Sequence, residues 1–140
     1  MPELWLVLDK QDVPFEDYLD MRVSLNCLDE LDEMAKSLSL RPLSAHVGME
    51  EDDWEAMREE MIDAGIEDAE PWTPEQRPFF PAAEGVDWSR KIRAHLQTLD
   101  DPFPDAPDTK EDIIEELKEL ERILEQADRA GAKWGLMYGT

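Results

Sequence analysis

The stretch KEDIIEELKELERILEQADRAGAKWGLMY, residues 110–138, decides the fold expected of this 140-residue chain. Its first part repeats apolar residues at the spacing of one helix face: Ile113, Ile114, Leu117, Leu120, Ile123, Leu124 and Ala127. Asp108 and Glu111 form a capping-box pattern at the start of this predicted helix, and Gly131 ends it. The residues that follow, Lys133–Tyr138, have the composition of a strand.

A second strand is predicted at the other end of the chain. Leu4–Leu8 is an unbroken apolar run between acids, and it is too short for a helix. Two short strands at the two termini need to pair with or lie beside one another to be stable. Alternating apolar and polar residues predict a weaker third strand over residues 42–47.

Three more helices are expected, over residues 26–39, 52–64 and 84–99, with Asn26 as the cap of the first. In the second of these, one apolar stripe is predicted to face the core: Trp54, Met57, Met61 and Ala64. The expected fold class is therefore α+β and mostly helical. It has about four helices around a small sheet formed by the N- and C-terminal strands, in a single domain over residues 1–140.

The charge of the chain restricts its partners and its compartment. With 14 Lys and Arg against 36 Asp and Glu, the net charge is −22, which argues against nucleic-acid binding and against an anionic membrane surface. Cys27 is the one cysteine and has no partner for an internal disulfide. The sequence contains neither a signal-peptide pattern nor a long apolar stretch, so we expect a cytoplasmic protein.

The acids are concentrated in residues 49–70, which hold eleven acids and one base, Arg58. Opposite the apolar stripe, four of them form a predicted ladder along the helix: Asp52, Glu55, Glu59 and Asp63. Like charges at this spacing destabilise a helix, and a cationic protein partner would relieve the repulsion. The ladder is therefore predicted to bind a basic partner. The alternative is a solvated face that only keeps the protein soluble. A basic group on the third helix, Arg90 to Arg93, is a candidate to neutralise the ladder within the fold.

The segment 70–81 carries four prolines and cannot form regular structure. It also carries three aromatic residues: Trp72, Phe79 and Phe80. One interpretation is that they fold back over a small core. The other is that one or two of them project and serve as anchors of a protein interface.

Two function classes remain open. The first is a non-enzymatic acidic binding protein, such as an inhibitor, an immunity protein or a charge mimic that engages a cationic protein. The second is a carboxylate-based, metal-dependent enzyme, which requires a cleft with two carboxylates and an inward-facing histidine. We expect no catalytic residues, no metal site and no cofactor, since the glycines are scattered and no Cys/His set has ligand spacing. The identity of the partner and the oligomeric state are left open.

Several short motifs of the second half carry a family resemblance. They are FPAAEG at 80–85, Trp88 on the helix after it, LKELERIL at 117–124 and GAKW at 131–134. Over about residues 79–140 the chain resembles a group of short acidic bacterial proteins of unknown function. The resemblance implies a shared fold and carries no activity with it.

Because crowded carboxylates repel one another, screening them with salt should stabilise the folded chain. The Debye length falls from about 10 Å at 0.1 M salt to about 3 Å at 1 M. We expect the melting temperature, measured by circular dichroism at constant pH, to rise when NaCl is increased from about 50 to about 500 mM. A melting temperature that falls over this range would contradict charge repulsion as a controlling term.

Overall fold

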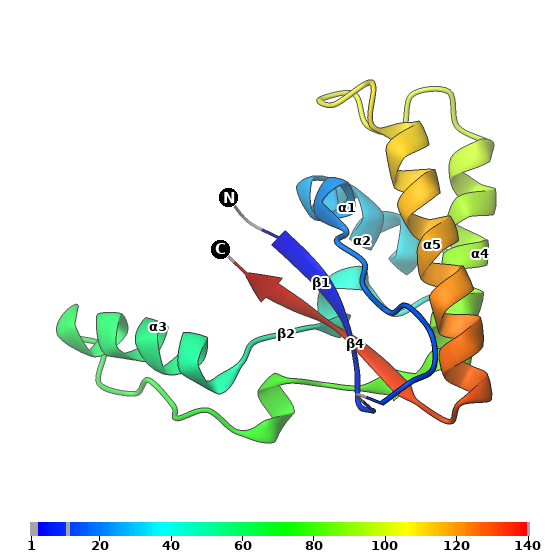
Figure 1. The fold of residues 1–140 in the computed structure, drawn as a ribbon. Coiled ribbons are helices and arrows are strands. Elements are labelled where there is room, and N and C mark those ends of the chain that lie inside the picture. Colours follow the sequence, from blue (N-terminus) through cyan, green and yellow to red (C-terminus); the bar gives the residue numbers. More distant parts are fainter. Residues whose placement is uncertain (1–2, 11, 140) are drawn as a thin grey trace.

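The computed structural model describes residues 3–10 and 12–139 (Figure 1). Its central element is strand β4 (Lys133–Gly139), to which β1 (Glu3–Leu8) is antiparallel over its whole length. The register runs from the pair of Glu3 and Gly139 to the pair of Leu8 and Trp134. The expected pairing of the two terminal strands is confirmed, and with it the α+β class.

Two very short strands share the other edge of β4. Strand β3 (Phe80–Pro81) is antiparallel to the start of β4, and β2 (Val47–Gly48) runs parallel to β4 at Leu136 and Met137. The chain between these two strands therefore leaves the sheet and returns to it on one edge. We call this segment, residues 49–79, the arm.

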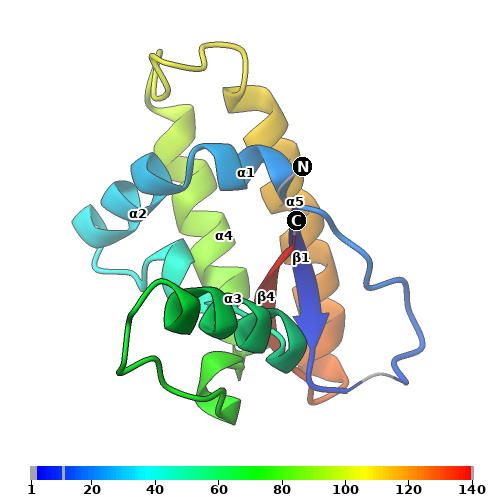
Figure 2. The ribbon, with the colours of Figure 1, turned by 90° about the vertical axis from the view of Figure 1, so that its left-hand side faces the viewer.

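One face of the sheet is covered by two long helices, α4 (Ala82–Gln97) and α5 (Lys110–Arg129) (Figures 1 and 2). All seven apolar residues of the predicted α5 stripe are buried. The Ser89 hydroxyl of α4 donates to the Leu117 carbonyl of α5, at 2.6 Å, inside this interface. The predicted capping box of α5 is wrong: Thr109 holds the cap position, and no side chain caps the helix there.

The expected helix over residues 26–39 is present as α2 (Leu28–Ser37), and an additional short helix, α1 (Arg22–Asn26), precedes it. Asn26 is the last residue of α1 and Cys27 holds the N-cap position of α2, so the predicted role of Asn26 as a cap is wrong. A distant carboxylate lies at the start of α1: Glu116 of α5 accepts hydrogen bonds from the Val23 and Ser24 amides, at 3.0 and 2.8 Å. Glu116 thus satisfies the free amides at the start of α1, which the local sequence cannot do.

The third strand predicted over residues 42–47 is also largely wrong. Residues Leu43–His46 form a 3₁₀ helix, η1, and only β2 after it is extended. The Asp32 carboxylate of α2 accepts from the Ser44 amide at 3.1 Å, which holds this turn in place. Alternation of apolar and polar residues over so short a segment does not distinguish a strand from a turn of 3₁₀ helix.

The acidic helix is present as α3 (Glu51–Asp63) and lies in the arm, followed by a short 3₁₀ helix, η2 (Pro74–Gln76). The structure describes every residue of α3, and none of them is buried, so the expected packing of its apolar stripe on the core is wrong. In Figure 1 the arm extends on the side of the sheet opposite α4 and α5, and Figure 2 shows α3 in front of the strands. None of the described helices is long and apolar enough to cross a membrane.

Leu120 lies in the middle of the α5 stripe and is fully buried. Leu120→Ala should therefore lower the free energy of unfolding by about 2–4 kcal/mol, because it leaves a cavity in the core. Leu120→Met, which nearly conserves volume, should cost less than about 1.5 kcal/mol. Urea unfolding followed by circular dichroism measures both values, and equal stability of the alanine variant and the wild type would refute the placement of this residue.

Candidate protein-docking arm

Hydrogen bonds and an ion pair fix the base of the arm. The Met49 amide donates to the Gln76 carbonyl at 2.9 Å, so the outgoing and returning chains are bonded to each other. The Trp72 indole donates to the Met49 carbonyl, also at 2.9 Å. Arg77 and Glu50 form an ion pair at 3.2 Å. The arm therefore starts from a closed base and is not an open loop.

Two glycines let the returning chain lie directly on the sheet. A Cβ atom on Gly135 of β4 would lie 2.5 Å from the Pro78 carbonyl oxygen, and one on Gly48 would lie 2.8 Å from the Arg77 Cα. Both distances are shorter than real Cβ contacts, so any side chain at these positions would push the base of the arm away from the strands. The close approach sets the position from which α3 projects.

Helix α3 packs on the returning chain of the arm instead of on the core. The Trp54 indole donates to the Glu70 carbonyl at 2.9 Å, and the Arg58 guanidinium donates to the Ala69 carbonyl at 3.0 Å. Glu55 accepts from the Trp72 amide at 3.2 Å and forms an ion pair with Arg58 at 3.3 Å. The side of α3 with the predicted apolar stripe thus faces residues 69–72. The backbone carbonyls of Ala69 and Glu70 accept hydrogen bonds from this side of the helix.

The structure divides the predicted acidic ladder into two parts. Asp52, Glu59 and Asp63 are exposed, whereas Glu55 is half-buried and holds Trp72 and Arg58. Of the eleven acids in residues 49–70, only Glu50 and Glu55 form ion pairs within the described part of the chain. The other nine leave the arm with a dense and uncompensated negative charge.

The basic residues of α4 do not neutralise this charge, so the expectation that they would do so is wrong. Arg90 pairs with Glu121 and Glu125 of α5, and Arg93 also pairs with Glu121. Lys91 pairs with Asp87 on its own helix, at 3.0 Å. The two arginines connect the core helices, and all three bases are paired away from the arm.

The three aromatic residues predicted as cover or anchors are all half-buried. Trp72 belongs to the base of the arm. The Arg77 guanidinium lies over the Phe79 ring, 5.4 Å from the centre of that ring. Phe80 packs against the core: its ring contacts the His46 ring edge-on at 4.8 Å, and the Arg41 guanidinium covers it at 4.1 Å. Phe80 therefore lies as the covering interpretation expects, and the other two flank the base of the arm.

Apolar surface on the arm is the feature that sequence reasoning missed. Met57 is 37% exposed, Ile62 48% and Ile66 41%, although a helix on the core would have buried such residues. Together with Tyr18 and Tyr138 they are the large apolar side chains that the described structure exposes most. A signal in the sequence was available, since Ile62 and Ile66 lie outside the single stripe that the predicted core contact required.

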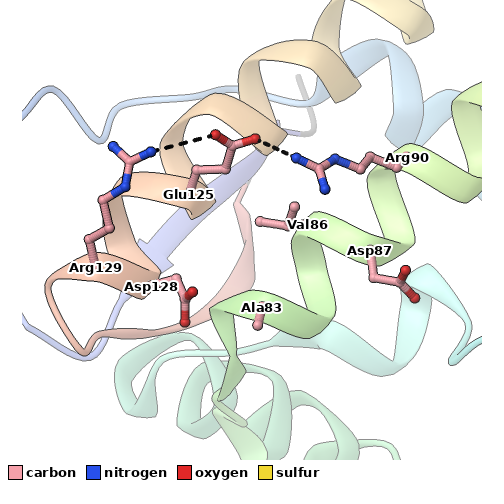
Figure 3. Close-up of a pocket in the computed structure, with 7 residues that line it drawn as sticks. All are labelled: Ala83, Val86, Asp87, Arg90, Glu125, Asp128 and Arg129. Carbon is pink, nitrogen blue, oxygen red and sulfur yellow. Dashed lines mark hydrogen bonds and ion pairs between the residues drawn. The ribbon is translucent and has the colours of Figure 1, made fainter.

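Elsewhere in the described structure, a cavity of about 340 Å³ lies between α4 and α5 (Figure 3). It is an open groove lined by Ala83, Val86, Asp87, Arg90, Glu125, Asp128 and Arg129. Glu125 lies between the two arginines and bonds to both, at 2.9 Å to Arg90 and 4.0 Å to Arg129 (Figure 3). Asp87, Arg90, Glu125 and Arg129 are already in ion pairs, and the residues that line the groove include neither a histidine nor a nucleophile for catalysis.

A second cavity, of about 220 Å³, has the residue types that the enzyme alternative requires. It is lined by Ser39, Leu40, Arg41, His46, Glu84, Asp87 and Trp88. Its two carboxylates are engaged, since Glu84 pairs with Arg41 at 3.2 Å and Asp87 pairs with Lys91. The cavity also lies beside Ser39, which follows the end of α2 and has a positive φ of 59°.

His46 in this cavity is a structural residue by its surroundings. Its ring is only 2% exposed, stacks on Trp134 at 4.6 Å and bonds through Nδ1 to the Pro42 carbonyl at 3.1 Å. A carbonyl can only accept, so Nδ1 carries the proton. Burial lowers the pKa of His46 from 6.5 to about 4, which makes it a weak general base at neutral pH.

Neither Cys27 nor the metal-ligating side chains form a reactive site in the described residues. Cys27 is buried against Thr109, and burial raises the pKa of its thiol, so the reactive thiolate is disfavoured. Within residues 3–10 and 12–139, no three His, Cys, Asp or Glu side chains converge where they could hold a metal ion. The arm is therefore the strongest functional feature of the described structure.

In comparisons with known proteins, the chain matches no protein-family model, no curated protein and no solved structure.

The buried His46 generates a test by pH. The unfolded chain protonates this ring below about pH 6.5 and the folded chain only near pH 4, so protons favour unfolding. Between about pH 7.5 and about pH 5, His46 should lower the free energy of unfolding by about 2 kcal/mol. Urea unfolding at the two pH values measures the change.

His46→Asn is the control for this pH effect. The variant is less stable overall, but it should lack the His46 part of the pH dependence. Burial raises the pKa of Glu116, whose contribution therefore has the opposite sign and is common to both proteins. If the wild type and the variant lose stability equally between the two pH values, the histidine is not held neutral in the fold.

Proposed function

We propose that this protein binds a cationic protein partner through the arm, with the exposed acids of α3 as the binding face. One observation carries the proposal: a helix with dense unpaired acids projects from the sheet, and none of its residues is buried in the fold. A helix that contributes nothing to the core and repels itself gains the most from a partner that supplies opposite charge.

The geometry favours rapid capture of such a partner. Asp52 and Glu59 are seven residues apart, and Glu59 and Asp63 are four apart, so their carboxylates share one side of α3. A concentrated negative field at a projecting element accelerates association with a positively charged surface. Because the base of the arm is closed by hydrogen bonds, the binding face is already ordered before contact, which lowers the entropy lost on binding.

The partner class follows from the charge. Basic proteins with an anion-binding surface fit best, and an inhibitor, an immunity protein or a charge mimic acts in this way. A nucleic acid or an anionic membrane would be repelled by the net charge of −22. The proposal places this interaction in the cytoplasm of a bacterium, in line with the resemblance of the second half of the chain.

The alternative function, a carboxylate-based enzyme, would use the cavity beside His46. The cavity favours it by composition, because a histidine and two carboxylates line one space of about 220 Å³. Two observations weaken it: the pKa of about 4 makes His46 a weak general base near neutral pH, and both carboxylates are held in ion pairs. The binding proposal therefore has the stronger support.

The proposal is tested with a synthetic ten-lysine peptide as a cationic probe. The variant Asp52→Asn/Glu59→Gln/Asp63→Asn should bind it roughly tenfold more weakly than the wild type at low salt, because three surface charge pairs are lost. The dependence of the affinity on NaCl should also become shallower. Isothermal titration calorimetry at about 20 and about 200 mM NaCl measures both effects.

The matched control removes three exposed acids from the loop between α4 and α5, as Asp101→Asn/Asp105→Asn/Asp108→Asn. Acids of α5 are unsuitable, because Glu116 caps α1 and Glu125 pairs with Arg90. The control should change the affinity by less than about twofold. If both triple variants lose the same affinity, the acids act only as a solubilising coat and the proposal is wrong.

A further inference from the structure

A small apolar groove runs along the inner side of α3, where the helix meets the returning chain of the arm. It has a volume of about 80 Å³ and is lined by Trp54, Met57, Arg58, Met61, Ala69 and Glu70. The Arg58 guanidinium already has partners, since it donates hydrogen bonds to the Ala69 carbonyl and to the Glu55 carboxylate. The groove therefore presents apolar walls to whatever occupies it.

The groove is open to the surface at Met57, which is 37% exposed. Two exposed acids lie beside this residue on the same side of the helix: Asp53 precedes Met57 by four residues, and Glu60 follows it by three. Neither acid forms an ion pair within the described residues. On the other side of the groove Glu70 is exposed as well. The apolar opening is thus bordered by negative charge.

We infer that this groove holds one aliphatic side chain of the cationic partner, and that lysines or arginines next to that side chain pair with Asp53 and Glu60. The inference rests on the proposed function and names the part of the arm that gives it specificity. The volume fits a branched aliphatic group, because a water molecule takes about 30 Å³ of liquid and the groove admits roughly three groups of that size.

Charge decides between the candidate occupants. A second copy of this chain would bring its own arm, whose residues 49–70 hold eleven acids and one base, against the same acids, and the two would repel. A neutral apolar segment would gain nothing from Asp53 and Glu60. A basic segment with one apolar residue complements both parts of the surface, the groove and its acidic border.

Helix α3 has two acidic faces. By helical spacing, Asp52, Glu59 and Asp63 lie away from the residues that line the groove, whereas Asp53 and Glu60 lie next to one of them, Met57. The first set is expected to attract any polycation. The second set is expected to act together with the groove, so that its charge matters most for a peptide that also carries the aliphatic side chain.

The experiment compares two synthetic peptides of equal charge, nine lysines around a central leucine and nine lysines around a central serine. The wild type should bind the leucine peptide roughly tenfold more tightly, because burial of that side chain adds to the charge pairing. Ala69→Leu places a larger side chain in the groove and should remove this preference, while the affinity for the serine peptide stays within about twofold.

A pair of charge variants completes the test. The variant Asp53→Asn/Glu60→Gln should lower the affinity for the leucine peptide more than the variant Asp52→Asn/Glu59→Gln does, although each variant removes two charges. Equal binding of the two peptides by the wild type would overturn the inference and leave the proposed function standing. Failure to bind either peptide at about 20 mM NaCl would overturn both. Circular dichroism melting of each variant shows that it is folded.

Discussion

The pairing of β4 on both of its edges is the constraint on which the rest of the structure depends. On one edge β1 pairs along the whole strand, and on the other β3 and β2 divide the available backbone groups between them. Buried backbone groups need hydrogen-bond partners, so β1, β2 and β3 have to meet at this strand. The helices α4 and α5 then cover one face, and the arm begins where the second edge is filled.

The body and the arm are stabilised by different interactions. In the body, large apolar side chains such as Leu117 and Trp134 are fully buried, and burial of this kind supplies most of the free energy of folding. The arm has no buried residue between Glu51 and Pro81, and backbone bonds with a few ion pairs hold it together. Exposed residues of the arm can therefore change without loss of the core, which suits a surface that is specialised for a partner.

The charges are also divided between the two parts. In the body, the bases of α4 meet Glu121 and Glu125 of α5, so those acids help to hold the helices together. In the arm, most acids have no base within reach among the described residues, and self-repulsion remains. The net charge of −22 is therefore not an even coat. Its unpaired part is concentrated on the one element that projects from the sheet.

The sequence by itself determined the elements whose signal is local. The α5 stripe, the two terminal strands and the acidic helix follow from periodicity and composition, and all of them are present. Only the tertiary structure decided the features that depend on distant residues. Glu116 starts α1 from ninety residues away, and the glycine contact at Gly135 sets the base of the arm. The apolar stripe of α3 was visible in the sequence, but its partner was not, because periodicity shows which side of a helix is apolar and says nothing of what covers it. For the same reason the ladder from Asp52 to Asp63 included Glu55, which accepts a hydrogen bond from the returning chain, and omitted Asp53 and Glu60, which lie next to the groove residue Met57 by helical spacing. The groove itself exists only once the returning chain has folded back on α3.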